Sequence, residues 1–240
     1  MKKSKKKMIV AAAACAMIGV MAIGGTMAYL TDAETATNTF TIGKVQIDLE
    51  EPNYPGNDSA EVKNLVPNQK VKKDPQIENT GNNDAIVFLK VEIPTANVVV
   101  AADDGTKQAA AKTELFKLLG LDTKNWTEIS KDDTSATNTV YVYAYNKALA
   151  KNAKTEALFN SVQLQNVIEG QVDAATENIK VTAYAIQSTE VMNGETDLTD
   201  TLDKASLTSI YNIYVKQNDG KEAKDAATNN AKNLAGEARQ

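Results

Sequence analysis

The chain has 240 residues, of which 42% are hydrophobic and 24% are charged, and its formal net charge is −5. These proportions are typical of a globular protein and exclude a collagen, a disulfide scaffold and a multi-span membrane protein. The sequence contains no His and a single Cys. The absence of His removes the commonest general base and the commonest zinc ligand, so most hydrolase mechanisms are difficult to assemble from this chain.

Residues 1–28 have the layout of a signal peptide. Five Lys among the first seven residues precede an uncharged run over 8–25, and small side chains follow at Thr26 and Ala28. This layout predicts export and cleavage by a signal peptidase after Ala28, which leaves Tyr29 as the first residue of the mature chain. An uncleaved membrane anchor is the alternative, because the apolar run is about long enough to span a bilayer. Both interpretations place the rest of the chain outside the cell.

Cleavage at this position changes both the charge and the cysteine content of the chain. The leader carries five Lys and no acidic residue, so its removal takes the formal net charge from −5 to −10, and Cys15 is removed with it. An acidic chain disfavours anionic partners, and the single Arg, Arg239, leaves it without the forked donors that favour phosphate. Nucleic acid is therefore not an expected partner.

Alternation of apolar and polar side chains, which is typical of strands, dominates the mature chain. The strongest predicted strand covers 85–93. Further strands are predicted at 40–49 with a kink at Gly43, and at 97–101, 126–129, 139–145, 161–164 and 179–186. Helical spacing at 109–119 and 200–215 predicts two helices. Residues 216–240 have little to bury and are expected to form a flexible tail.

This series of elements predicts the fold class. Seven or eight short strands with one or two short helical inserts favour an antiparallel β-sandwich over a parallel α/β sheet. The strand pattern alone does not separate a barrel from a sandwich. We interpret residues 44–215 as a mainly β, jelly-roll-like sandwich domain.

Three groups of Asp are the candidate cation ligands. They are Asp103 with Asp104, Asp132 with Asp133, and the set Asp197, Asp200 and Asp203. The first two groups lie in predicted turns, where Asp hydrogen-bonds its own backbone, and the third precedes or opens the last predicted helix, where carboxylates suit the dipole. A calcium site needs about six oxygens from several segments. Turn and cap roles are therefore favoured over metal binding.

Tyr141, Tyr143 and Tyr145 share one face of a predicted strand. Such a row could stack on sugar rings, but sheet packing is favoured because aromatic side chains pair across strands. The sequence also has no phosphate-binding glycine loop, no nucleophile elbow and no zinc-binding H-E-x-x-H motif. No catalytic residue, metal ligand or cofactor is therefore assigned.

Several short motifs together match the pattern of a known family. They are GGTMAYLTDAETATNTFTIGKVQIDL at the leader junction, Leu65-Val66-Pro67 with Val71, Glu78-Asn79-Thr80-Gly81 followed by AIVFLKVEI, and VTAYAIQ at 181–187. In these motifs the chain resembles the TasA/camelysin family of secreted proteins from Gram-positive bacteria. Asn68 departs from the family pattern, in which Gly often follows the Pro, and this leaves the type of that turn open.

The resemblance implies a jelly-roll domain, removal of the leader by a dedicated type I signal peptidase, and deposition at the cell surface or in the biofilm matrix. TasA-like members form head-to-tail homopolymers by donor-strand complementation, in which the N-terminal segment of one subunit fills a groove in its neighbour. Here the donor segment would be 29–43, with Tyr29, Leu30, Phe40 and Ile42 as apolar anchors. A matrix or cell-wall accessory protein is a further candidate partner.

Three functions compete for this sequence. A structural fibre subunit is favoured. The family's other label, metallo-endopeptidase, is disfavoured because a mature chain without His or Cys offers zinc only carboxylates, which zinc rarely accepts alone. A non-polymerising surface adhesin that uses the tyrosine row is the third. We therefore expect a chain that is not an enzyme.

Overall fold

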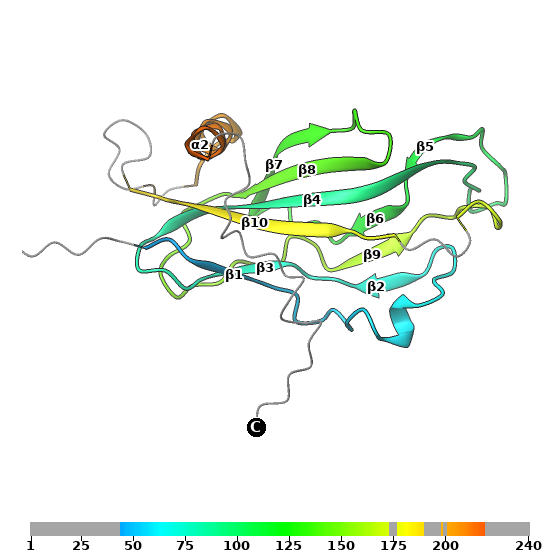
Figure 1. The fold of residues 1–240 in the computed structure, drawn as a ribbon, viewed down its shortest axis with the longest axis horizontal. Helices are drawn as coiled ribbons and strands as arrows, with labels where there is room; N and C mark the ends of the chain where they lie inside the picture. The colour runs from blue at the N-terminus through cyan, green and yellow to red at the C-terminus, as the bar shows by residue number, and fades with distance from the viewer. Residues whose placement is uncertain (1–43, 173–176, 190–197, 199–200, 219–240) are drawn as a thin grey trace, which may run out of the picture. The chain divides into compact units, whose positions relative to one another are not determined.

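The computed structural model describes residues 44–172, 177–189, 198 and 201–218 (Figure 1). Several sequence predictions lie outside these residues: the signal peptide, the cleavage-site residues Thr26, Ala28 and Tyr29, the donor anchors Leu30, Phe40 and Ile42, and the tail beyond residue 218. None of the helices in the described part of the chain is long and apolar enough to cross a membrane.

The described residues form antiparallel sheets with one short 3-10 helix and one α-helix. The strands are β1 (Ile47–Glu50), β2 (Lys70–Lys72), β3 (Gln76–Asn79), β4 (Ala85–Val98), β5 (Ala111–Glu114), β6 (Phe116–Leu119), β7 (Trp126–Asp132), β8 (Asn138–Tyr145), β9 (Ser161–Leu164) and β10 (Lys180–Gln187). The helices are η1 (Ala60–Val62) and α2 (Lys204–Gln217). The prediction of a mainly β, antiparallel sandwich with a helical insert is confirmed.

β4 is the central strand of the largest sheet. The strand order is β10-β4-β8-β7, and β5 pairs with the last four residues of β4. β1-β3 and β2-β9-β6 form two smaller sheets, and Figure 1 shows β10, β4 and β8 side by side. The predicted strands 85–93 and 97–101 are therefore largely one strand. Pro94 does not interrupt it: Pro94 stays in register with Asn138 of β8, and its carbonyl accepts a hydrogen bond from the Leu115 amide at 2.8 Å.

One hydrophobic core contains the inner face of β4, and the predicted alternation of 85–93 is confirmed there. Val87, Leu89, Val91 and Ile93 all point into this core, as one face of a strand must. The other sheets and loops contribute further buried side chains, including Ile47, Leu49, Ile77, Leu115, Leu158 and Phe159.

A second core lies on the opposite face of β4, under helix α2. Ile86 and Phe88 are fully buried there with Leu207 and Ile210 of the helix. The helix begins at Lys204 because the Asp203 side chain caps it, accepting a hydrogen bond from the Ser206 amide at 2.7 Å. The helix predicted at 200–215 is confirmed, with its first turn displaced to this cap.

The helix predicted at 109–119 is wrong. This segment forms β5 and β6, which pair with different strands, β4 and β9. Leu115 and Phe116 are both buried although they are consecutive, because the chain passes there from one sheet to the next. Pairing with these distant strands outweighs the local helical preference of an Ala-, Lys- and Leu-rich segment.

Candidate functional site

The sheets of the described domain end in edge strands that differ in how they are protected. β7 carries Lys131 and Asp132 and has a register shift between Glu128 and Ser130. β2 is also an edge strand, and it exposes two charged side chains, Lys70 and Lys72. Charges and bulges on an edge strand hinder pairing with another chain.

β10 is an edge strand of a different kind. It has eight residues, pairs only with β4 among the described strands, and carries one charged residue, Lys180. Its outer edge therefore presents backbone N–H and C=O groups with little charge to hinder an added strand. Of the described edge strands it offers the longest sparsely charged surface for strand addition.

Both faces of β10 are buried. Val181 and Ala183 lie in the core that faces the smaller sheets, and Tyr184 and Ile186 lie in the core under α2. Residues of β1 contact residues of β10, and Figure 1 shows the two strands close together, although they belong to different sheets. A strand added at this edge would thus have hydrophobic layers on both sides, where its apolar side chains could be buried.

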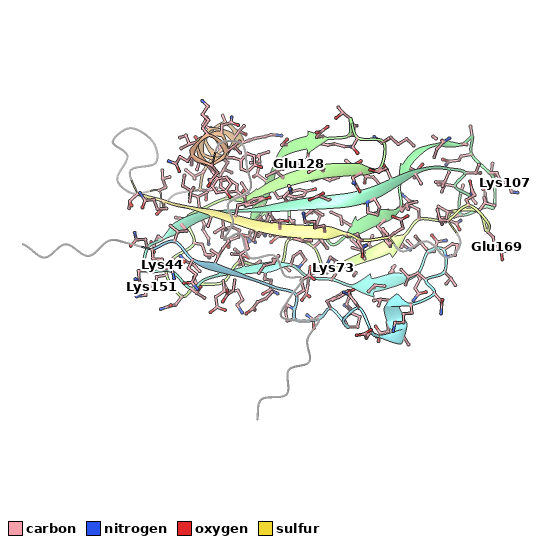
Figure 2. The ribbon with its side chains drawn as sticks, in the orientation of Figure 1. Lys44, Lys73, Lys107, Glu128, Lys151 and Glu169 are labelled. Atoms are coloured by element: carbon pink, nitrogen blue, oxygen red, sulfur yellow. The ribbon has the colours of Figure 1, made fainter. Side chains whose placement is uncertain are left out.

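A partly buried polar cluster holds the loop that follows β1. The backbone amide and the side-chain amide of Asn53 donate to the Asp74 carboxylate at 2.9 and 2.6 Å. Lys73, labelled in Figure 2, pairs with Glu51 and lies 5.0 Å from the centre of the Tyr54 ring. The sequence analysis missed this cluster, because the run Lys72-Lys73-Asp74-Pro75 has the composition of an exposed turn.

Three of the candidate cation ligands, Asp104, Asp132 and Asp203, have the turn and cap roles that the sequence favoured. Asp104 accepts from the Thr106 amide at 2.9 Å, and Asp132 accepts from the amide and hydroxyl of Thr134 at 3.0 and 2.7 Å. These hydrogen bonds lower the pKa of both carboxyl groups, as the Ser206 amide lowers that of the Asp203 cap. Asp197 and Asp200 lie outside the described residues.

Tyr143 and Tyr145 lie in the core and the half-buried Tyr141 packs against it, which confirms the packing interpretation. Tyr143 and Tyr145 are only 4% and 2% exposed, Tyr141 stacks on Tyr143 with ring centroids 6.0 Å apart, and Tyr145 packs edge-on against Trp126. Burial raises the pKa of all three phenols, and the carboxylates of Glu114 and Glu156 accept hydrogen bonds from Tyr141 and Tyr145. The row therefore does not offer a surface on which a sugar ring could stack.

The family model of camelysin metallo-endopeptidase matches residues 3–222 of this chain. The chain belongs to the camelysin family. This family includes TasA, so the resemblance found in the sequence is confirmed, and it supports a surface or secreted protein at the level of the family. A search of the curated proteins found no match.

The camelysin family name implies a metal ion, and the side chains of this chain do not fit one well. The sequence has no His, and its single Cys is Cys15. In the described ranges no three His, Cys, Asp or Glu residues come together as a group that could hold a metal ion. Zinc sites in proteins are built mainly from imidazole and thiolate ligands. We therefore assign no metal ligand and derive no catalytic step through a metal.

Proposed function

We propose that this chain is a structural subunit of a surface or biofilm-matrix fibre, and that it polymerises by adding its N-terminal segment to β10 of a neighbouring copy. The observation that carries the proposal is the outer edge of β10, which has no strand partner among the described residues and hydrophobic layers on both faces. Membership of the family that includes TasA adds support.

The donor would be the segment 29–43, which becomes available when a signal peptidase cuts after Ala28. Its apolar side chains at Tyr29, Leu30, Phe40 and Ile42 flank a polar middle that keeps the free segment soluble. Each large apolar side chain that becomes buried contributes about 1.5–3 kcal/mol, and backbone hydrogen bonds to β10 add direction and register. Because donor and acceptor would be different segments of one chain, each subunit would both donate and accept, and the contact would repeat into a filament.

The first test removes the donor. A chain that begins at Tyr29 is compared by electron microscopy with a chain that begins at Gly43. Filaments from the first and none from the second are expected. Filaments from both chains, or from neither, would contradict donor-strand assembly.

The second test blocks the acceptor. Ala185 is a partly buried residue of β10 that packs against the core facing the smaller sheets, so A185K places a charge where an added strand would pack. This variant should donate but not accept, and the chain that begins at Gly43 should accept but not donate. Mixed together, the two should form one-to-one complexes that stop at the dimer. S130K, on the exposed face of edge strand β7, is the matched control and should still form filaments.

Peptidase activity is the second candidate, because the family carries that name. We propose that the chain is not an enzyme, since its side chains lack the usual zinc ligands. The test is hydrolysis of casein by the purified chain with and without a chelator. Hydrolysis that the chelator abolishes would favour the peptidase and contradict this proposal.

A further inference from the structure

The turn that follows β3 is fastened to the residues that lead into β1. The Thr80 amide donates to the Gln46 carbonyl at 3.0 Å, and the Asn82 amide donates to the Lys44 carbonyl at 2.9 Å. Residues 44–46 come directly after the segment 29–43 that we propose as the donor strand. The described domain therefore holds the base of that segment by backbone hydrogen bonds.

Asn79 organises this turn from inside the domain. Its side chain is fully buried, donates to the Asn83 and Leu149 carbonyls at 2.9 Å each, and accepts from the Gly81 amide at 3.0 Å. Each of these three hydrogen bonds joins the Asn79 side chain to a backbone group, so the turn has little freedom to move. The segment that follows β8 also contacts this region, because the Asn79 amide donates to the Ala153 carbonyl at 2.9 Å and the Lys151 amide donates to the Asp84 carboxylate at 3.0 Å.

Gly81 allows the two segments to approach. A Cβ atom at this position would lie 2.6 Å from the Lys44 carbonyl oxygen and 2.8 Å from the Gln46 nitrogen. Both neighbours are backbone atoms, which cannot rotate away as a side chain could. Any residue larger than Gly must therefore push residues 44–46 away from the turn.

We propose that the 79–82 turn is a clamp that fixes the base of the donor segment, and that Gly81 is its positioning residue. The inference depends on the proposed function. A strand that pairs one residue out of register presents the wrong face, so a donor with a fixed base reaches its acceptor in one register. A fixed base also reduces the length of chain that must be ordered on binding, which favours assembly.

The first experiment loosens the clamp in the chain that begins at Tyr29. In G81A, the Thr80 and Asn82 amides should exchange with solvent about tenfold faster or more, while the Leu89 amide in the core keeps its rate. Filament growth should slow by a similar factor. T80V is the matched control: it removes a buried hydroxyl that has no hydrogen-bond partner among the described residues and keeps the backbone amide, so exchange and growth should not change.

The second experiment leaves the domain intact. Insertion of Gly-Ser between Gly43 and Lys44 separates the donor segment from the clamp without altering residues 44–240. Protection of the amides in the 79–82 turn should be unchanged. The filaments should change in one of two ways: growth slows about tenfold, or the axial repeat lengthens by up to about 7 Å, the span of two extended residues. This variant keeps the clamp testable if G81A does not fold.

The outcomes separate the two proposals. If the unsubstituted chain forms no filaments, the proposed function is wrong and the clamp inference fails with it. If it does form them, and both G81A and the insertion variant grow at the same rate with the same repeat, only the clamp inference is overturned. Slower growth of T80V by the same factor as G81A would also overturn it, because the effect would not depend on the approach at Gly81.

Discussion

The Nζ atom of Lys73 lies 2.7 Å from Oε1 of Glu51, and the two side chains are only 10% and 8% exposed. Removal of one partner leaves a buried charge alone, so we expect E51Q to lower the free energy of unfolding by about 3–5 kcal/mol. Urea denaturation of the chain that begins at Tyr29 measures this. The double variant with Lys73→Met and Glu51→Met should recover much of the loss, because it buries no charge. A double variant as unstable as E51Q would show that the ion pair itself stabilises the loop.

The turn over 66–69 predicts how Asn68 responds to substitution. The Gln69 amide donates to the Val66 carbonyl at 3.0 Å, Pro67 precedes Asn68, and Asn68 has φ 67°. This is a type II turn, whose third residue favours Gly, so Asn68 adopts the conformation that a Gly would supply. We expect N68A to cost about 1 kcal/mol and N68G to cost less than about 0.5 kcal/mol. Equal losses in thermal unfolding would contradict a left-handed Asn68.

Hydrogen-bonded carboxylates predict how the stability of the fold decreases at low pH. At Asp122 burial raises the pKa, but hydrogen bonds from Asn125 and Lys124 outweigh it and hold the pKa below the ordinary 3.8. A lowered native pKa contributes stability that is present above the unfolded pKa and is lost as the pH falls below 3.8 toward the native value. The midpoint of thermal unfolding should therefore fall across this range.

D122N should reduce this dependence on pH, because the amide does not titrate. The comparison is made as the change in midpoint between neutral and acid pH, in the variant and in the unsubstituted chain. An identical pH dependence in the two proteins would show that Asp122 has an ordinary pKa in the folded state.

The buried tyrosine side chains predict how the stability of the fold decreases at high pH. Burial raises the pKa of Tyr143 and Tyr184 well above the ordinary 10.0. A raised native pKa contributes stability that is fully present below pH 10.0 and is lost as the pH rises beyond it. We expect tyrosinate absorbance to appear together with the loss of the circular dichroism of the sheets. Tyrosinate from most of the phenols near pH 10.0 with the sheets intact would contradict this expectation.

The elements that could be predicted from the sequence are those whose pattern of apolar and polar residues depends only on neighbouring positions. The strand at 161–164 and the faces of 85–93 follow from alternation, because a strand with one buried face must alternate whatever its partners are. The segment 109–119 was mispredicted because its structure depends on pairing with β4 and β9, which local spacing does not encode.

The candidate site depended even more on information that a sequence does not hold. The apolar character of 179–186 was visible, but which strand remains at an edge is decided by the strand order. Gly81 and Lys44 approach each other closely although they are 37 positions apart in the sequence. A single Gly in the sequence does not predict such a contact. The acidic residues were easier to interpret, because Asx turns and helix caps involve neighbours within three residues.

The position of β4 determines how the domain comes apart. This one strand pairs with β10, β8 and β5 and contributes one face to each of two cores, so loss of β4 would disrupt both. Residues 44–218 contain no Cys that could cross-link the layers. Loss of structure should consequently be a single cooperative event with a high kinetic barrier. For a member of a family of surface and secreted proteins, such a barrier gives long-lived resistance to proteolysis without covalent reinforcement.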